Sequence, residues 1–396
     1  MIDINVFDFK KKNLKNPAFL HITMIQTPLC ETLGCKHPII QAGMGPFSTN
    51  NLCVASANAG IVGLVSTSGL FAATLYGKSG QEYLYGGLAK WVGKDVKIKP
   101  KDLLKEIFYK ILRETKGSGG IFGANVMVSA ELRTVASDYI NTIIEVRKED
   151  SDMEKRLNLL VTSAGDPLAW TNVVKPSGIK WFHVIPFVSA AKRAEKAGVH
   201  GVIASGHEGG FHVAWEPLHS MVLIPAVVDA CPSLQVVATG GICDGKTTAA
   251  SLALGALGVQ IGTRLIATKE SDFPDLWKNM ILKTPDRGTI VTRAFVGPGR
   301  FMKSPQSMKL ADFTVKHSPK LYIGVADDLT QVNPEILKTE VEGVIDAFRG
   351  KEDTALAAAG ECAQRVKDVP TVKELIDRIV ADAEEILKTL PQKYVK

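Results

Sequence analysis

Residues 199–268 read VHGVIASGHEGGFHVAWEPLHSMVLIPAVVDACPSLQVVATGGICDGKTTAASLALGALGVQIGTRLIAT. Three short apolar runs lie in this stretch, at 201–204, 235–238 and 258–261, and each ends in a turn of small residues. Segments of helical character separate the runs. This order of strand, polar loop and helix indicates a parallel α/β sheet whose loops at the carboxyl ends of the strands carry the chemistry.

Five further apolar runs precede this stretch, at 38–41, 61–65, 121–125, 158–161 and 179–185. The chain therefore holds eight short, Val- and Ile-rich strands that alternate with helices. Continuous apolar runs are what strands buried on both faces require. We predict an α/β fold, a (β/α)8 TIM barrel with a smaller, mainly helical lid region, and a doubly wound sheet is the structural alternative.

The regularity of the pattern divides the chain into regions. Residues 1–26 form an N-terminal extension, and residues 27–270 form the barrel. Within the barrel, residues 70–100 show no clear period and are interpreted as an insertion, because barrel loops are usually short. Residues 271–359 are expected to form the helical lid and substrate region, and residues 360–396 a C-terminal helix that packs back on the barrel.

Composition excludes several classes of protein. The chain has 396 residues, of which 45% are hydrophobic and 22% charged, so a large core is expected. The net charge of +6 is spread along the chain, which disfavours nucleic acid and offers a mild field for anionic cofactors or substrates. The six cysteines have no metal-binding spacing and are expected to be reduced thiols of a cytoplasmic protein. No run reaches the roughly 18 apolar residues of a membrane span.

The turns after the seventh and eighth strands carry the clearest ligand signal. They contain Gly240 and Gly241 in one turn and Gly262 and Thr263 in the other. Barrel enzymes commonly bind phosphate between these two loops. Glycines allow backbone N–H groups to approach phosphate oxygens, and a threonine hydroxyl adds a donor. Tight turns without a ligand are the alternative.

The loop after the sixth strand, GHEGGFH at 206–212, contains two histidines and one glutamate. A metal site is disfavoured, because the spacing is not HExxH and a glycine-rich loop does not hold ligands on one helical face. We predict that His212 is a catalytic acid or base and that His207 is structural. Cofactor contacts are also predicted for Ser205, Gly209 and Gly210.

Two earlier strands end in further candidates. Ala42, Gly43 and Met44 lie at the end of the first strand, where a flat ring could lie against the backbone. Asn125, at the end of the third strand, offers an amide toward the edge of such a ring, and tying a loop is its alternative role. His183 lies within the fifth strand and is interpreted as an interior histidine.

These motifs resemble those of the nitronate monooxygenase family, formerly called 2-nitropropane dioxygenases, which includes flavin-type enoyl-ACP reductases. The shared segments, in order, are QAGMG, GANVMV, VTSAGDP, ASGHEGGFH, ATGGICDG and GVQIGTRLIATKES. The resemblance implies a barrel that binds FMN non-covalently. It places Gly43 and Met44 beside the flavin ring with Asn125 near it, and it makes His212 the catalytic histidine. It also implies that Gly240, Gly241, Gly262 and Thr263 bind the phosphate.

Two departures from the family bear on the reaction. Many members have Gly before the histidine where this chain has Phe211, and many monooxygenases have Lys where this chain has Val184. We expect an FMN-dependent oxidoreductase, and the reaction that we consider first is oxidation of alkyl nitronates by O2. The first alternative is an enoyl-thioester reductase that uses NAD(P)H, and the second alternative is a non-catalytic FMN-binding module. The expected binding partner is a small-molecule substrate, and neither nucleic acid nor a membrane is expected as a partner. A homodimer is one option for the oligomeric state.

Overall fold

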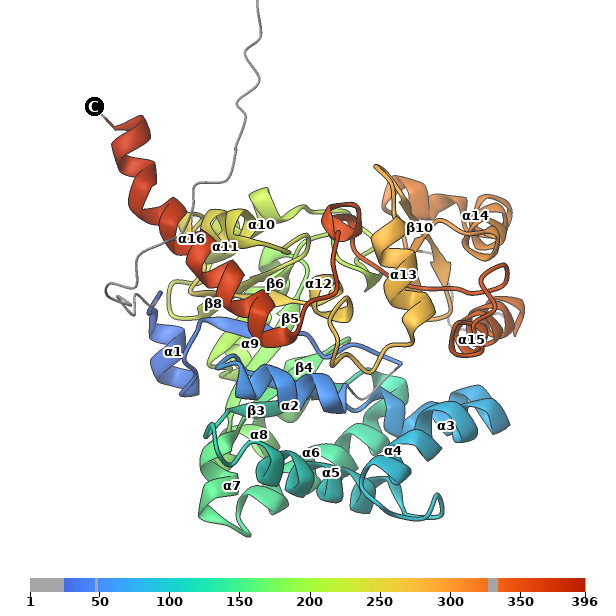
Figure 1. Cartoon of the computed structure of the whole chain (residues 1–396), viewed down its shortest axis with the longest axis horizontal. Helices are drawn as coiled ribbons and strands as arrows, with labels where there is room; N and C mark the ends of the chain where they lie inside the picture. The colour runs from blue at the N-terminus through green and yellow to red at the C-terminus, as the bar shows by residue number, and fades with distance from the viewer. Residues whose placement is uncertain (1–24, 47–48, 327–333, 396) are drawn as a thin grey trace, which may run out of the picture.

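The computed structural model describes residues 25–46, 49–326 and 334–395, so most of the predicted N-terminal extension lies outside the described residues. Eight parallel strands form a barrel that helices surround (Figure 1). These strands are β1 (Ile39–Gln41), β2 (Gly63–Ser66), β3 (Phe122–Met127), β4 (Leu157–Ser163), β5 (Lys180–Ile185), β6 (Gly201–Ser205), β8 (Gln235–Thr239) and β9 (Gly258–Ile261).

The barrel closes between its first two strands. Neighbouring strands follow the order β1-β9-β8-β6-β5-β4-β3-β2. A parallel bridge then joins Ile40 of β1 to Val62, directly before β2. The predicted TIM barrel is confirmed, and the doubly wound alternative is excluded. All carboxyl ends of the strands therefore meet at one mouth, where barrel enzymes place their chemistry.

The interior of the barrel is packed with apolar side chains. Val161, Phe182 and Val237 lie in this cluster and have no exposed surface. Helix α1 (Pro28–Leu33) contributes Leu29 and Leu33 to the same cluster. Leu29 also lies against Gly258, at the start of β9. Helix α1 therefore plugs the amino end of the barrel and leaves the opposite end for the site.

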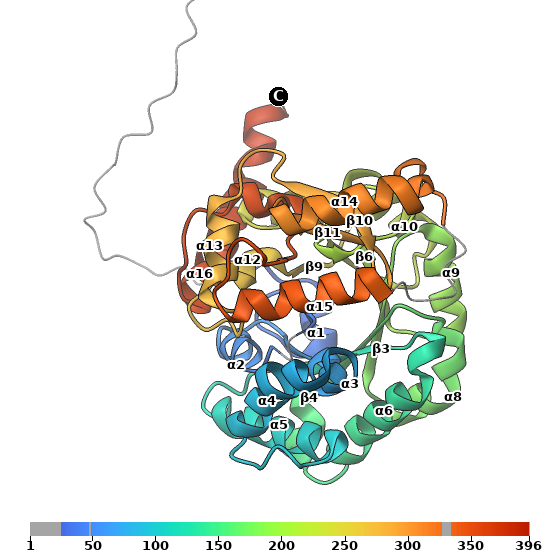
Figure 2. The same cartoon turned by 90° about the vertical axis from the view of Figure 1, so that its right-hand side faces the viewer.

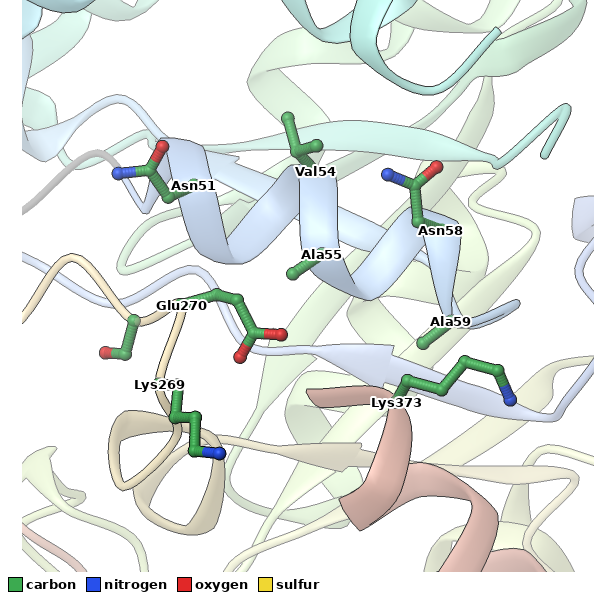
Figure 3. A pocket seen from close by; sticks show the side chains of 9 residues that line it. Asn51, Val54, Ala55, Asn58, Ala59, Lys269, Glu270 and Lys373 are labelled. Carbon is green, nitrogen blue, oxygen red and sulfur yellow. The ribbon is translucent and has the colours of Figure 1, made fainter. Parts of the chain in front are cut away.

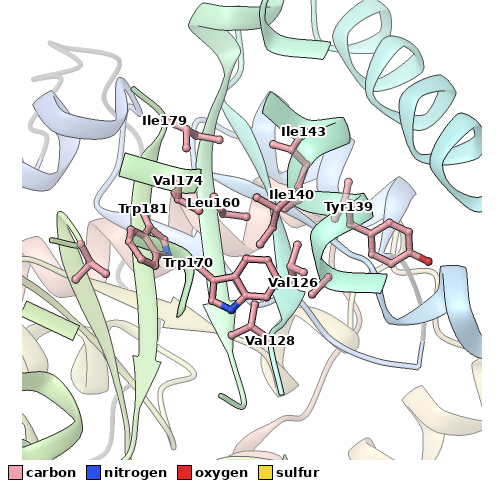
Figure 4. Packing of buried hydrophobic residues seen from close by; sticks show 14 of the residues in the cluster. Val126, Val128, Tyr139, Ile140, Ile143, Leu160, Trp170, Val174, Ile179 and Trp181 are labelled. Atoms are coloured by element: carbon pink, nitrogen blue, oxygen red, sulfur yellow. The ribbon is translucent and has the colours of Figure 1, made fainter. Parts of the chain in front are cut away.

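The outer layer of helices buries the other faces of the strands. It comprises α2 (Asn50–Asn58), α5 (Pro100–Glu114), α6 (Arg133–Arg147), α7 (Ser151–Arg156), α8 (Thr171–Val174), α9 (Val188–Ala197), α10 (Ser220–Ala230), α11 (Gly245–Ala253) and α12 (Thr263–Ile266). Figure 4 shows Leu160 and Trp181 of the strands packed with Ile140 and Ile143 of α6. Trp170 and Trp181 are 4% and 1% exposed, so both are core residues.

The insertion after β2 is helical, although the sequence shows no clear period there. It forms α3 (Ser68–Gly80), a π-helical turn (Gln81–Tyr85) and α4 (Gly86–Trp91). Glycine and tyrosine obscured the helical period in the sequence. Gly77 has a φ of 56° and interrupts α3, which explains why no regular pattern is visible there.

The lid region contains helices and one β-hairpin. Its elements are α13 (Asp275–Lys283), β10 (Thr289–Ala294), β11 (Gly297–Met302), α14 (Pro305–His317) and α15 (Pro334–Phe348). Strand β11 pairs with β10 and also with β7 (Phe211–His212), in the loop after β6. The lid is thus joined to the barrel mouth by a three-stranded antiparallel sheet that the sequence did not predict. Figure 2 shows α15 between α14 and α3, with α13 beside α15.

The last long helix, α16 (Val372–Tyr394), packs against α11 and α2. Its buried residues include Leu375, Ile376 and Ile379, which join the cluster formed around β1 and β9. Since α12 has only four residues, α16 takes the place of the eighth barrel helix. The helix begins twelve residues after Gly360, where the sequence suggested that it starts, and a 3-10 turn (Glu361–Arg365) lies between.

Candidate active site

The loops after β1, β6, β8 and β9 meet at the carboxyl end of the barrel. A Cβ atom added at Gly240 would lie 2.7 Å from the carbonyl oxygen of Gly206. One added at Gly262 would lie 3.4 Å from the sulfur of Met44 and 3.5 Å from the Cβ of Ala42. Residues predicted from separate motifs are therefore neighbours in space.

Gly43 and Asn125 form the half of the site expected to face a planar ring. A Cβ atom at Gly43 would lie 2.5 Å from the Cβ of Asn125, so only glycine fits here. Asn125 is 8% exposed, and its Nδ2 donates to the carbonyl of Val161 (3.4 Å) and to the hydroxyl of Ser163 (3.3 Å). Its Oδ1 lies on the Gly43 side. This oxygen can accept a hydrogen bond from a ring N–H.

The two glycine turns form the other half of the site. Gly240 and Gly241 have φ values of 99° and 75°, a backbone region that favours glycine. The hydroxyl of Thr263 accepts a hydrogen bond from the N–H of Gly360 (2.8 Å), so the C-terminal segment lies against the turn after β9. The hydroxyl proton of Thr263 can still be donated. Small residues and accessible N–H groups fit a phosphate at this position.

Gly209 and Gly210, in the loop after β6, have different surroundings. A Cβ atom at Gly209 would lie 3.9 Å from the hydroxyl of Ser205, within the mouth. One at Gly210 would lie 2.5 Å from the backbone nitrogen of Gly360, so Gly210 permits the C-terminal segment to pack closely. A contact between Gly210 and a cofactor stays a prediction.

His212 lies in β7, opposite Gly299 of the lid hairpin. His212 is exposed to solvent. Protein atoms nevertheless surround the imidazole closely enough to lower its pKa. Burial in this protein mass, with the positive charge of Arg293 as the second cause, lowers the pKa of His212 to about 4. The imidazole is therefore neutral at physiological pH. It offers one N–H donor and one acceptor nitrogen to a ligand in the mouth.

The rest of this loop is tied to the protein framework. The Glu208 carboxylate accepts hydrogen bonds from the backbone N–H (3.0 Å) and hydroxyl (3.0 Å) of Ser220, at the start of α10. Arg300 of β11 donates to the carbonyls of His207 (3.0 Å) and Gly209 (3.1 Å). Burial, followed by the charge of Arg300, lowers the pKa of His207 to about 4. Glu208 and His207 thus have structural contacts, as predicted for His207.

Three interacting residues were not predicted from the sequence: Arg293, whose charge acts on His212, Glu340 near Arg293, and Tyr76 near Glu340. Arg293 of β10 and Glu340 of α15 are 4% and 1% exposed. Burial raises the pKa of Glu340 to about 7, although the Phe295 N–H donates to its carboxylate (2.9 Å) and Arg293 is near. Burial and then the charge of Glu340 raise the pKa of Tyr76 of α3. No local motif marks these residues, because they come from three separate segments.

His183 and a hollow on the surface lie outside this site. His183 is an interior histidine, 2.8 Å from the hydroxyl of Thr162, as predicted. A hollow of about 550 Å³ lies between α2, Lys269 and Lys373 (Figure 3). It opens on the outside of the barrel rather than at its mouth. It is therefore not assigned to the chemistry of His212.

No group of three or more His, Cys, Asp or Glu residues in the described part of the chain could hold a metal ion. Within the same residues, no helix has the length and apolar character needed to cross a membrane.

The sequence was compared with a family model of nitronate monooxygenases, which matches residues 26–382. The chain belongs to the nitronate monooxygenase family. The resemblance stated from the motifs is thereby confirmed, and the chain is an oxidoreductase of this family.

Individual members of the nitronate monooxygenase family show how far the likeness extends. A Mycobacterium tuberculosis protein named (3aS,4S,5R,7aS)-5-hydroxy-7a-methyl-1-oxo-octahydro-1H-indene-4-carboxyl-CoA dehydrogenase is 29% identical, and the match covers 92% of this chain and 98% of that protein. A probable nitronate monooxygenase of Staphylococcus aureus is 27% identical, over 68% of this chain and 76% of its own length. Among solved structures, FabK from Thermotoga maritima has a TM-score of 0.72 and 25% identity, and the match covers 93% of this chain and 100% of FabK.

Proposed function

We propose that this chain is an FMN-dependent oxidoreductase that acts on an acyl thioester, at the carbon–carbon bond next to the thioester carbonyl. The observation that carries the proposal is a neutral histidine, His212, at the mouth where the glycine turns of β8 and β9 meet. The likeness to a carboxyl-CoA dehydrogenase over nearly the whole chain supports the thioester. FMN supplies hydride transfer when it is bound.

The residues of the mouth fit the parts of FMN. The Gly240–Gly241 and Gly262–Thr263 turns would hold the phosphate. Ala42, Gly43 and Met44, with Asn125 opposite, would face the ring. Ser205 and Gly209 line the side between these two halves.

The titration of His212 limits its role. With a pKa of about 4, roughly one molecule in a thousand carries the extra proton at pH 7. His212 is therefore expected to be neutral in most molecules at pH 7. It is suited to donate its single N–H to the thioester carbonyl oxygen, or to accept a proton from the carbon beside that carbonyl.

Oxidation of an alkyl nitronate is the second candidate function. The match to the probable nitronate monooxygenase of Staphylococcus aureus favours it. A neutral His212 could also donate to a nitronate oxygen. This reaction needs O2, whereas the thioester reaction uses NAD(P)H or a second electron carrier.

Flavin absorbance under argon separates these candidates. We expect NADH, NADPH or a saturated acyl-CoA to bleach the flavin of the purified, FMN-loaded protein. After reduction by NADH or NADPH, an enoyl-CoA should restore the flavin absorbance. Bleaching by propyl-2-nitronate alone would instead establish the second candidate.

Variants then test the role of His212. His212→Gln should retain FMN and lose about 100-fold or more in turnover. His317→Gln, on an exposed part of α14, is the matched control and should be unchanged. Full turnover in His212→Gln would show that His212 is not catalytic. Bound FMN with no bleaching by any substrate class would favour a non-catalytic module.

A further inference from the structure

Phe211, directly before His212, adopts a left-handed backbone conformation. Its φ is 61°, and it is one of four non-glycine residues with positive φ in the described part of the chain. A bulky residue in this region is a clear outlier, because its Cβ crowds the neighbouring backbone. Such strain costs about 1–3 kcal/mol and persists only where the surroundings enforce it.

Contacts on both sides of Phe211 enforce this conformation. Arg300 donates to the Gly209 carbonyl on one side, and the N–H of Val213 donates to Pro298 (3.1 Å) on the other. Gly210 lies directly against the backbone of Gly360. The chain is therefore held before and after Phe211 by the lid and by the C-terminal segment.

The left-handed turn changes where the Phe211 ring lies. In an extended strand, successive side chains point to opposite faces. Here the ring centroids of Phe211 and His212 are only 4.2 Å apart, at an interplanar angle of 41°. The Phe211 ring also meets Phe301 of β11 edge to face, at 5.9 Å. The ring therefore contacts both the imidazole and the core of the lid.

The same ring borders the mouth. Phe211, Met44 and Tyr76 are partly buried and pack against the lid core. They come from the loop after β6, the loop after β1 and helix α3. Met44 also touches the turn after β9 through Gly262. Phe211 therefore stands at the apolar edge of the proposed FMN and substrate site.

We propose that Phe211 is a positioning and size-determining residue: its ring holds the imidazole of His212 in one orientation and limits the substrate to slender, unbranched acyl groups. The limit on the acyl group rests on the proposed function, whereas the positioning of His212 does not. The low pKa of His212 is consistent with a ring that excludes water from one side of the imidazole.

The test compares Phe211→Ala with Phe211→Gly in the FMN-loaded protein. Crotonyl-CoA and cinnamoyl-CoA, which differ by an aromatic ring, serve as substrates. In both variants we expect kcat/KM for cinnamoyl-CoA relative to crotonyl-CoA to rise about 10-fold or more. We also expect kcat for crotonyl-CoA to fall, since the imidazole is no longer held. An unchanged ratio in both variants would overturn the limit on acyl size.

Two readouts do not depend on activity. The pKa of His212, followed by NMR of labelled histidine, should move from about 4 toward its ordinary value of 6.5 in both variants. Arg293 of β10, whose charge acts on His212, and the groups linked to it, Glu340 of α15 and Tyr76 of α3, are unchanged in these variants. Phe211→Gly should also unfold at a higher urea concentration than Phe211→Ala, because glycine tolerates the positive φ. An unmoved pKa, or the reverse order of stability, would overturn the positioning role.

Phe313→Ala is the matched control. Phe313 of α14 forms another Phe–His ring pair, with His317 at 4.5 Å, and no ring contact joins it to His212 among the described residues. It should leave the substrate ratio and the pKa of His212 unchanged. If wild-type protein turns over neither thioester, the proposed function fails, and the pKa and urea comparisons still decide the positioning role.

Discussion

At the scale of single residues, glycine positions divide into those that require glycine for conformation and packing and those where a methyl group could be accommodated. Gly240 belongs to the first group, since its φ is 99° and a Cβ atom would collide with Gly206. Gly262 belongs to the second group. Its φ is −110°, and a Cβ atom there would make ordinary contacts of 3.4–3.5 Å.

This difference makes Gly262 the sharper probe of the phosphate prediction. Gly262→Asp should lose FMN, because a carboxylate would repel the phosphate and fill its site. Gly262→Ala should keep FMN with little change in thermal stability. Flavin content by absorbance and folding by circular dichroism distinguish the two variants. Retention of FMN in folded Gly262→Asp would place the phosphate elsewhere.

At the scale of elements, residues with a strained backbone conformation occur mainly in the loops that follow the barrel strands. Of the four non-glycine residues with positive φ in the described ranges, Thr49, Ala164 and Phe211 lie in the loops after β1, β4 and β6. All three loops leave the carboxyl ends of strands. Backbone strain is typical of functional regions, where the fold enforces unusual conformations. The amino end, plugged by α1, has no such residue among those described.

The contact between α15 and β10 should make stability depend on pH. Glu340 is protonated in the fold up to about pH 7, whereas its ordinary pKa is 4.5. Between these values the unfolded chain releases a proton that the folded chain keeps, so stability falls as pH rises from about 4.5 to 7. The difference amounts to about 3 kcal/mol.

Glu340→Gln should remove this dependence, because Gln can still accept the Phe295 N–H and does not titrate. We expect similar stabilities at pH 4.5 and a more stable variant at pH 7.5. Urea unfolding at several pH values measures the difference. Parallel pH profiles for the two proteins would contradict the assignment to Glu340.

At the scale of the whole molecule, the chain closes its barrel with its own C-terminus. After β9 the chain builds the lid and then returns as α16 beside α2 and α11. On the way, Gly360 donates to Thr263, and Arg264 pairs with Asp368 at 2.5 Å. Formation of the mouth therefore depends on residues about a hundred positions apart.

The core face of α16 should contribute strongly to global stability. Ile376 has no exposed surface, so Ile376→Ala should cost about 2–5 kcal/mol through lost burial and a residual cavity. Leu390, on the same helix, is 42% exposed, and Leu390→Ala should change stability by less than about 0.5 kcal/mol. Urea midpoints measure both effects. Equal midpoints for the two variants would show that α16 is not part of the barrel's cooperative unit.

The sequence by itself determined the eight strands, the TIM barrel and the glycine turns at the ends of β8 and β9. These features depend on local patterns: short apolar runs, alternating helices and small residues at fixed positions. His183 and His207 were also interpreted correctly, because interior and loop positions follow from the same patterns. The helices of the insertion were not predicted, because Gly77 and its neighbours disrupt the helical period.

Only the tertiary structure decided the surroundings of His212. Strand β7 has two residues and exists because β11, nearly ninety positions later, pairs with it. Arg293 acts on His212 from β10, Glu340 of α15 lies near Arg293, and Phe211 is held left-handed by contacts with the lid and with Gly360. Such long-range contacts leave no periodic pattern in the sequence, since each of these residues contacts a partner that is distant along the chain.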